Sequence, residues 1–178
     1  MKSLKLFLAL SAILCVSVLY AEENTYIKQQ VAYKDPGASG KELTWDFGML
    51  SPINEEYTVA YSIPDSNYMH QWCATEHRTR YYYTLTADTI WRTGYENPTT
   101  FVQYTQPEAV LRLPLRYGDT LVTDFVAKGE YGHRIPMTLL GTNTIEVDAQ
   151  GKLILPDKTY EQVLRVHSQR QYVESGLD

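Results

Sequence analysis

The feature that most constrains this chain is its regular punctuation by turn residues. Short runs rich in Tyr, Thr, Val, Ile and Leu lie between clusters of Gly, Pro, Asn and Asp, and no long stretch has the apolar period of a helix. This pattern predicts an all-β fold in a single domain, either an antiparallel β-sandwich or an open half-barrel. The expected strands include residues 43–47, 56–63, 80–86, 109–115 and 119–127, and the expected turns include "YENPTT", "YTQPE", "RYGDT", "AKGEYGH" and "DAQGK".

The first residues have the layout of a secretory signal peptide. Two lysines precede an apolar run from Leu6 to Leu19, which is short for a bilayer span, and Ala21 stands before two acidic residues. We expect residues 1–21 to be removed and residues 22–178 to form one β domain that is secreted, periplasmic or at the cell surface. The alternative is an uncleaved membrane anchor.

The expected mature chain is acidic and has one cysteine. It has 14 lysine and arginine residues against 21 aspartate and glutamate residues, a formal net charge of −7. We expect no nucleic-acid partner, because binding to phosphates requires a basic face. Cys73 cannot form a disulfide within the mature chain, so the domain depends on its hydrophobic core, which suits a bacterial envelope.

The stretch "ILPDKTYEQVLRVHS", residues 154–168, is compatible with a helix or a strand. As a helix, Thr159 would be the N-cap and Gln162 would complete a capping box. As strands, "NTIEVDA" and "KLILP" form a hairpin around "QG", and Pro156–Asp157 turn the chain into a further strand. Local propensities favour the strand by only tenths of a kcal/mol. The preceding hairpin signals add weight to the strand.

In the strand interpretation, Leu164 and Val166 share one face and Arg165 points to the other. Arg165 could then pair with an acid such as Asp119 or Asp124, or face water. We expect the solvated arrangement, because arginines are mostly exposed.

Parts of the chain resemble a module of secreted and cell-surface proteins of the Bacteroidota. The segments that carry the resemblance are "GKELTWDF", "PEAVLRLPLRYGDT", Asp124 with Phe125, and "VDAQGKLILPDKTYEQVLRV". The resemblance implies an antiparallel β domain without an established activity, often followed by a sorting domain for type IX secretion, and it favours the strand interpretation. Relatives generally continue beyond the equivalent of Asp178, so we expect either a chain truncated there or a last strand that forms a bare sheet edge. Lys158 replaces the usual turn glycine, so we expect a type I turn.

Two groups of residues could carry chemistry. His70, Cys73, Glu76 and His77 are possible zinc ligands, but their spacing matches no known zinc motif, so we expect a polar loop with one thiol. A pair of carboxylates could hydrolyse a glycoside, and the acids around one turn are Asp119, Asp124 and Glu130. We interpret Asp119 as a turn acid that binds local backbone amides. We therefore assign no catalytic, cofactor-binding or metal-ligating residue and expect no cofactor.

The chain has 15 tyrosines against 4 phenylalanines, which indicates ordinary strand aromatics or a binding face. Tyr81, Tyr82 and Tyr83 are consecutive, so they must point to both sides of a strand. Our first hypothesis is an exported, non-catalytic envelope or secreted protein that binds a glycan, a lipid or a surface protein. The alternatives are a carbohydrate-active hydrolase that uses acidic residues, a periplasmic half-barrel that carries lipid, to which a short turn bears a faint likeness, or a purely structural module.

Overall fold

The computed structural model describes residues 24–63 and 72–176, and within these ranges it contains ten β-strands and no helix. The expected all-β class is therefore confirmed. None of the described segments is a helix that could cross a membrane. The strands are β1 (Asn24–Val31), β2 (Gly40–Asp46), β3 (Pro52–Ser62), β4 (Trp72–Glu76), β5 (Thr79–Thr86), β6 (Thr89–Glu96), β7 (Thr100–Arg112), β8 (Thr120–Tyr131), β9 (Ile135–Ile154) and β10 (Thr159–Ser175).

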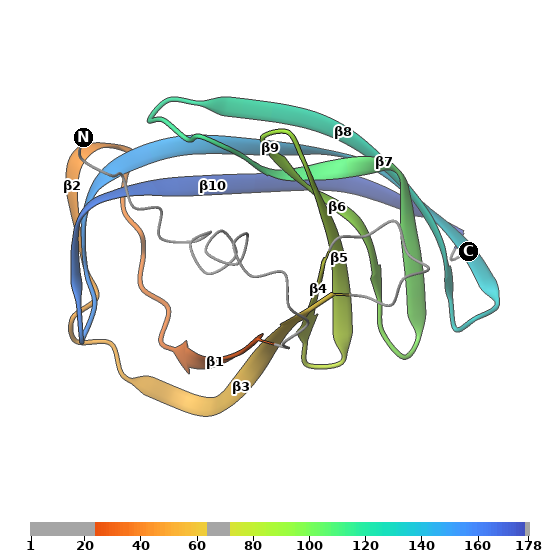
Figure 1. Cartoon of the computed structure of the whole chain (residues 1–178), viewed down its shortest axis with the longest axis horizontal. Helices are drawn as coiled ribbons and strands as arrows, with labels where there is room; N and C mark the ends of the chain where they lie inside the picture. The colour runs from red at the N-terminus through yellow and green to blue at the C-terminus, as the bar shows by residue number, and fades with distance from the viewer. Residues whose placement is uncertain (1–23, 64–71, 177–178) are drawn as a thin grey trace.

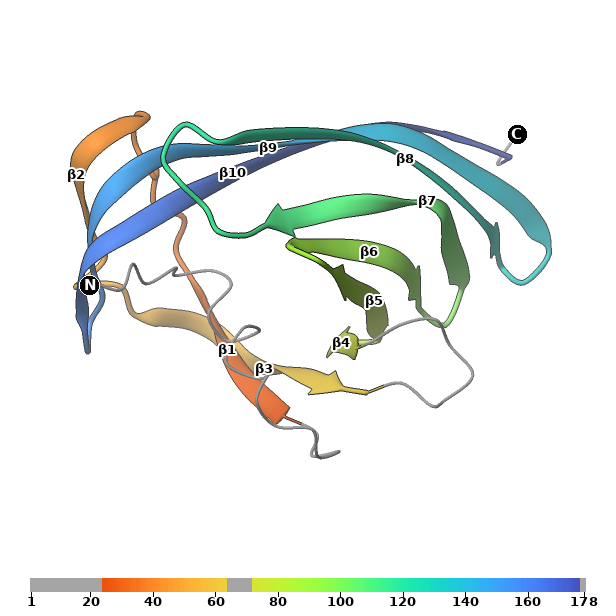
Figure 2. The same ribbon diagram turned by 45° about the horizontal axis from the view of Figure 1, so that its top comes forward.

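The strands form one open sheet in the order β1-β3-β4-β5-β6-β7-β8-β9-β10, with β2 attached to β9. Figures 1 and 2 show the sheet curled, so that β8, β9 and β10 lie on one side and β1 with β3 lies across from them. All neighbours on this path are antiparallel, whereas β2 pairs with β9 in parallel. The curled, open sheet corresponds to the half-barrel form of the expectation.

The strand β9 is long because two strands, β8 and then β2, pair with successive parts of the same edge. Its first half pairs with β8, ending at Thr120 opposite Glu146, and its last residues pair with β2. The expected turn at "DAQGK" is therefore wrong, since Gly151 lies inside the strand. A Cβ at this position would lie 2.0 Å from the backbone oxygen of Leu43, so glycine is needed for the close approach of β2.

The other expected turns are mostly confirmed. At Pro156–Asp157 the backbone N–H of Leu155 donates to the carbonyl of Lys158 at 2.8 Å, and β10 follows as a strand, as expected for "ILPDKTYEQVLRVHS". Lys158 does not adopt a positive φ, which agrees with the turn expected without glycine. The expected turn at "YTQPE" is wrong, because it lies within β7. The register shifts there between Tyr104 and Gln106, and such a bulge tolerates the proline that follows.

The second half of β7 leaves β8 and packs over β9 and β10. Ladder pairing with β8 ends at Gln106, and beyond it Leu111 contacts Val147 and Leu164 in a buried cluster. Val166 packs against the same cluster, so Leu164 and Val166 share a face as expected. Two further clusters lie on either side: Val102, Tyr104, Phe125, Ala127, Met137 and Leu139, and then Trp45, Ala149, Leu153 and Val163.

Candidate functional site: a polar strip inside the curled sheet

A buried carboxylate lies between two arginines where the sheet curls over itself. Glu108 on β7 is 2% exposed, and its Oε2 lies 3.4 Å from Nη1 of Arg92, its cross-strand neighbour on β6. On the other side, Oε1 lies 3.0 Å from Nε of Arg170, which comes from β10. The hydroxyl of Tyr104 donates to Glu108 at 3.0 Å and accepts from Nη2 of Arg170 at 2.9 Å. The four side chains therefore join the two facing parts of the sheet.

Two further polar side chains continue this arrangement along β9 and β10. Asn143 is buried and donates to the carbonyl of Ala109 at 2.9 Å, which satisfies a backbone oxygen of β7 beyond its pairing with β8. The hydroxyl of Ser168 donates to the amide oxygen of Asn143 at 2.9 Å. We call these six side chains the polar strip: Arg92, Tyr104, Glu108, Asn143, Ser168 and Arg170.

Tyrosines surround the arginines of the polar strip. Arg92 lies against the rings of Tyr81 and Tyr83, 5.7 and 5.9 Å from their centroids. Arg170 lies 4.5 Å from the ring centroid of Tyr172, which is 49% exposed, and 4.5 Å from that of buried Phe125. We call Tyr81, Tyr83, Tyr95 and Tyr172 the tyrosine rim, because three of these tyrosines contact an arginine and Tyr95 lies 6.4 Å from Tyr81.

The expectation that three consecutive tyrosines point to both sides of a strand is confirmed. Tyr81 and Tyr83 both contact Arg92, whereas the hydroxyl of Tyr82 donates to Glu96 at 2.7 Å. Glu96 also accepts from Arg80 at 3.2 Å, so a second, separate ion pair lies on the other side of β5 and β6.

Burial raises the pKa values of the tyrosine hydroxyls in this site. Desolvation, and then the neighbouring charge of Glu108, raise the pKa of Tyr104 to about 12. Desolvation also raises the pKa values of Tyr83 and Tyr95. For Arg92, burial alone would lower the pKa, but Tyr83 and Glu108 outweigh it and the net direction is upward. The site thus combines two guanidinium groups, the carboxyl group of Glu108 and a set of phenolic O–H donors.

The polar strip contributes less to the free energy of unfolding than apolar side chains of the same volume would, so stability alone does not explain it. A buried ion pair seldom stabilises a fold more than apolar side chains of similar volume would, because both charges lose their hydration. Among the described residues, three buried side-chain atoms have no hydrogen-bond partner: Nε of Arg92, Nε of Arg170 and Oγ1 of Thr123. Thr123 is in register with Asn143, which is itself in register with Arg170, so all three atoms belong to this region. Such unsatisfied groups in a native structure call for an explanation.

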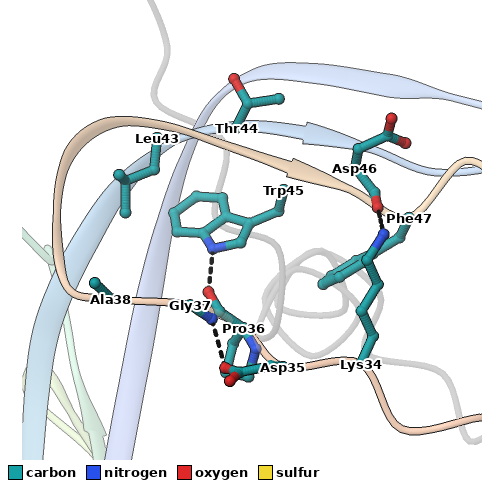
Figure 3. A pocket seen from close by; sticks show the side chains of 10 residues that line it. All are labelled: Lys34, Asp35, Pro36, Gly37, Ala38, Leu43, Thr44, Trp45, Asp46 and Phe47. Atoms are coloured by element: carbon teal, nitrogen blue, oxygen red, sulfur yellow. Dashed lines mark hydrogen bonds between the residues drawn. The ribbon is translucent and has the colours of Figure 1, made fainter.

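A hollow of about 190 Å³ lies apart from the polar strip, where the chain from Lys34 to Ala38 folds against β2. Figure 3 shows the indole of Trp45 donating to the carbonyl of Pro36, at 2.8 Å, and Lys34 donating to the carbonyl of Asp46. Arg165 donates to the same Pro36 carbonyl, at 2.7 Å, and to that of Gly37, at 2.9 Å. These polar groups are paired with one another, so their role is to hold the loop of residues 34–38 against β2 and β10.

The expected position of Arg165 in water is wrong. Its guanidinium forms two bonds with Asp148 on β9, at 2.9 and 2.8 Å, and lies 5.8 Å from the centroid of Trp45. The hydrogen bond from Arg165 is the main cause that lowers the pKa of Asp148. The partner is thus a third acid, neither Asp119 nor Asp124, and the loop carbonyls complete its surroundings.

Of the three acids considered for glycoside hydrolysis, Asp119 lies in the turn before β8, and Asp124 and Glu130 lie along this strand. Asp119 accepts from the backbone N–H of Arg116 at 2.7 Å, which confirms its interpretation as a turn acid. Asp124 accepts from the hydroxyl of Thr142 at 2.6 Å. At about 3.4 Å per residue along a strand, Asp119 lies about 17 Å from Asp124, and Asp124 about 20 Å from Glu130. A hydrolytic pair requires about 5 to 10 Å.

The possible zinc ligands also separate. Cys73 is buried within β4, so the expectation of a polar loop around it is wrong. His77 lies in the turn after β4 with a positive φ of 52°, and His70 lies outside the described residues. In the described part of the chain, no three His, Cys, Asp or Glu side chains are grouped to hold a metal ion.

No member of the polar strip was a candidate from the sequence. Arg92, Glu108 and Arg170 come from three strands, and each alternates with ordinary strand residues. The available signal was the pairing of charged residues with tyrosines inside runs otherwise typical of a buried strand. Comparisons with protein-family models, with curated proteins and with solved structures found no match to this chain.

Proposed function

We propose that this chain is an exported, non-catalytic binding protein that holds a glycan against the tyrosine rim and the polar strip. The observation that carries the proposal is the grouping of four tyrosines around two arginines, with Arg92 and Arg170 still 24% and 25% exposed. The groups that bind are therefore partly accessible while the carboxylate that orients them is buried.

The chemistry of a sugar fits this grouping. A sugar ring has an apolar C–H face, which packs on an aromatic ring, and a rim of hydroxyls, which exchange hydrogen bonds with planar polar side chains. Tyrosine supplies both a ring and a polar tip, and arginine supplies several fixed donors. A lipid chain would instead favour a large apolar surface, and the partly exposed side chains here are tyrosines and arginines.

The proposal includes export and the likeness to Bacteroidota surface proteins. The supporting features are the signal-like residues 1–21 and the segments, such as "VDAQGKLILPDKTYEQVLRV", on which the resemblance rests. Residues 1–23 lie outside the described structure. Expression of the full chain in a Gram-negative host and mass spectrometry of the product test this part directly. We expect a mature protein that begins at Glu22 and is found outside the cytoplasm. A full-length product retained in the membrane would contradict export with cleavage.

Glycan binding is tested by array screening followed by calorimetry on the mature protein. We expect at least one glycan to bind, and Tyr172→Ala to weaken it at least tenfold through loss of ring contact. The matched control is Tyr131→Ala, because Tyr131 is 45% exposed but lies at the far end of β8, about 20 Å from the level of Phe125. Equal losses in both variants, or binding of a lipid or a protein partner alone, would refute the glycan assignment. Release of shorter sugars would refute the non-catalytic assignment.

A further inference from the structure

We infer that the glycan bound at the polar strip carries a negatively charged group, either a carboxylate or a sulfate, which the arginines recognise. This inference rests on the proposed function and names the class of ligand. The polar strip contains two guanidinium groups, Arg92 and Arg170, and one carboxylate, Glu108, so it holds one uncompensated positive charge.

The three unsatisfied atoms of this region are all hydrogen-bond donors without an acceptor. The Nε atoms of Arg92 and Arg170 can only donate, and the hydroxyl of Thr123 has a proton to donate. Nε of Arg170 is within ion-pair distance of Glu108, at 3.0 Å, yet it makes no hydrogen bond there. These three atoms are themselves buried, so a ligand meets the exposed quarter of the Arg92 and Arg170 side chains, whose guanidinium groups also can only donate. An anionic group supplies acceptor oxygens to them, and an amine does not.

The geometry of arginine narrows the class further. A guanidinium presents its donors in a planar fork that matches the two oxygens of a carboxylate or of a sulfate. The rings of Tyr81, Tyr83 and Tyr172 hold the two guanidinium planes in place, so little rotamer freedom remains to be lost on binding. An acidic sugar unites both requirements, since its ring packs on tyrosine while its charge meets arginine.

One acid lies where it opposes such a ligand. Glu174 on β10 is exposed, shares the inner face with Leu139 in register, and influences the pKa of Tyr95. We expect Glu174→Gln to strengthen the binding of an acidic glycan a few-fold and to leave a neutral glycan unaffected, because the variant removes only a repulsive charge.

The experiment compares acidic oligosaccharides with neutral counterparts of the same backbone by calorimetry on the mature protein. The probes are oligogalacturonides with their methyl esters, and carrageenan- and heparin-derived oligosaccharides with their desulfated forms. We expect an acidic probe to bind about 10- to 100-fold more tightly than its counterpart, the size of one or two charge-assisted hydrogen bonds. Tighter binding of an oligogalacturonide than of its methyl ester indicates that the carboxylate is recognised, and tighter binding of a sulfated oligosaccharide than of its desulfated form indicates that the sulfate is recognised. Binding should weaken with salt.

Variants separate the site from the fold. Arg170→Lys keeps the charge and loses the fork, and we expect at least a tenfold loss for the acidic probe with an unchanged near-ultraviolet circular dichroism spectrum. The control is Arg80→Gln, because Arg80 is 60% exposed and pairs with Glu96 on the other side of the sheet. Equal affinity for acidic and neutral probes would overturn this inference and leave the proposed glycan function standing. If no glycan of either kind binds, the proposed function itself is refuted.

Discussion

Oε1 of Glu108 lies 3.0 Å from Nε of Arg170, although the two residues belong to β7 and β10, which are three places apart in the sheet order. A flat sheet would keep these strands about 14 Å apart, because neighbouring strands are about 4.8 Å from each other. The contact exists because the second half of β7 leaves β8 and crosses over β9 and β10. The ion pair is thus a consequence of the curl of the sheet.

Removal of Glu108 should be strongly destabilising. In Glu108→Ala the side chains of Arg92 and Arg170 lose their shared carboxylate in a buried site, and we expect the free energy of unfolding to fall by about 3–5 kcal/mol. Urea unfolding measures this value. Glu161→Ala, which breaks only the exposed pair with Lys152, should cost about 0–1 kcal/mol and serves as the control. A loss below 1 kcal/mol in Glu108→Ala would contradict the buried ion pairs.

An apolar replacement of the whole ion group should separate stability from binding. In the quadruple variant Arg92→Met, Tyr104→Phe, Glu108→Leu and Arg170→Met, neither a buried charge nor the buried hydroxyl of Tyr104 is left unpaired. We therefore expect stability equal to or above that of the parent. The same variant should bind no glycan. If it binds as well as the parent, the polar strip has no part in recognition.

Gly151→Ala should detach β2 from β9. The new Cβ would lie 2.0 Å from the backbone oxygen of Leu43, and neither backbone can yield without breaking the parallel pairing. We expect a loss of about 2–4 kcal/mol, in the range of large backbone effects, and increased protease cleavage between Gly40 and Asp46. Lys152→Ala, one residue further along, breaks only the exposed pair with Glu161 and should cost about 0–1 kcal/mol. Unchanged protection of β2 in Gly151→Ala would contradict this role of the glycine.

The local part of this fold was predictable and the non-local part was not. Leu164 and Val166 could be placed on one face from strand alternation alone, and Pro156–Asp157 could be recognised as a turn, because both depend on neighbouring residues. The glycine at 151 gives the same local signal whether the chain turns there or another strand approaches it closely.

The partners of Arg165 and Glu108 could not be predicted for a related reason. Arg165 binds Asp148 and the distant carbonyl of Pro36, and Glu108 binds Arg170, so each depends on how the sheet curls. Local rules place an arginine in a strand at the surface by default. These side chains become buried only when the whole sheet has assembled and curled.

The pair of Asp148 and Arg165 should make stability depend on acidic pH. Arg165 lowers the pKa of Asp148 in the folded state. The contribution is therefore fully present above the unfolded pKa of about 3.9 and is lost as pH falls through the folded pKa. We expect Asp148→Asn to be about 1–2 kcal/mol less stable than the parent at pH 7, and this difference to shrink below about pH 4. A difference that stays constant down to pH 2 would exclude the linkage.

Tyr104 should make stability depend on alkaline pH in the opposite sense. Burial raises its pKa to about 12, above the unfolded value of about 10, so its contribution is present below pH 10 and is lost as pH rises to about 12. Tyr104→Phe lacks this ionisation. Between pH 10 and 12 its free energy of unfolding should therefore fall by about 2–3 kcal/mol less than that of the parent. Absorbance at 295 nm during titration should show one fewer late-ionising tyrosine in the variant. Parallel stability curves for parent and variant would contradict the raised pKa.

The most direct test of the account follows the arginine Nε–H signals by nitrogen-15 nuclear magnetic resonance during titration with the tightest acidic oligosaccharide. Assignment uses Arg92→Lys and Arg170→Lys. We predict that the signals of Arg92 and Arg170 shift as the exposed parts of their guanidinium groups bind the acidic group, while those of Arg80 and Arg165, which lie outside the polar strip, stay in place. Unmoved Arg92 and Arg170 signals at saturating ligand would contradict binding at the polar strip.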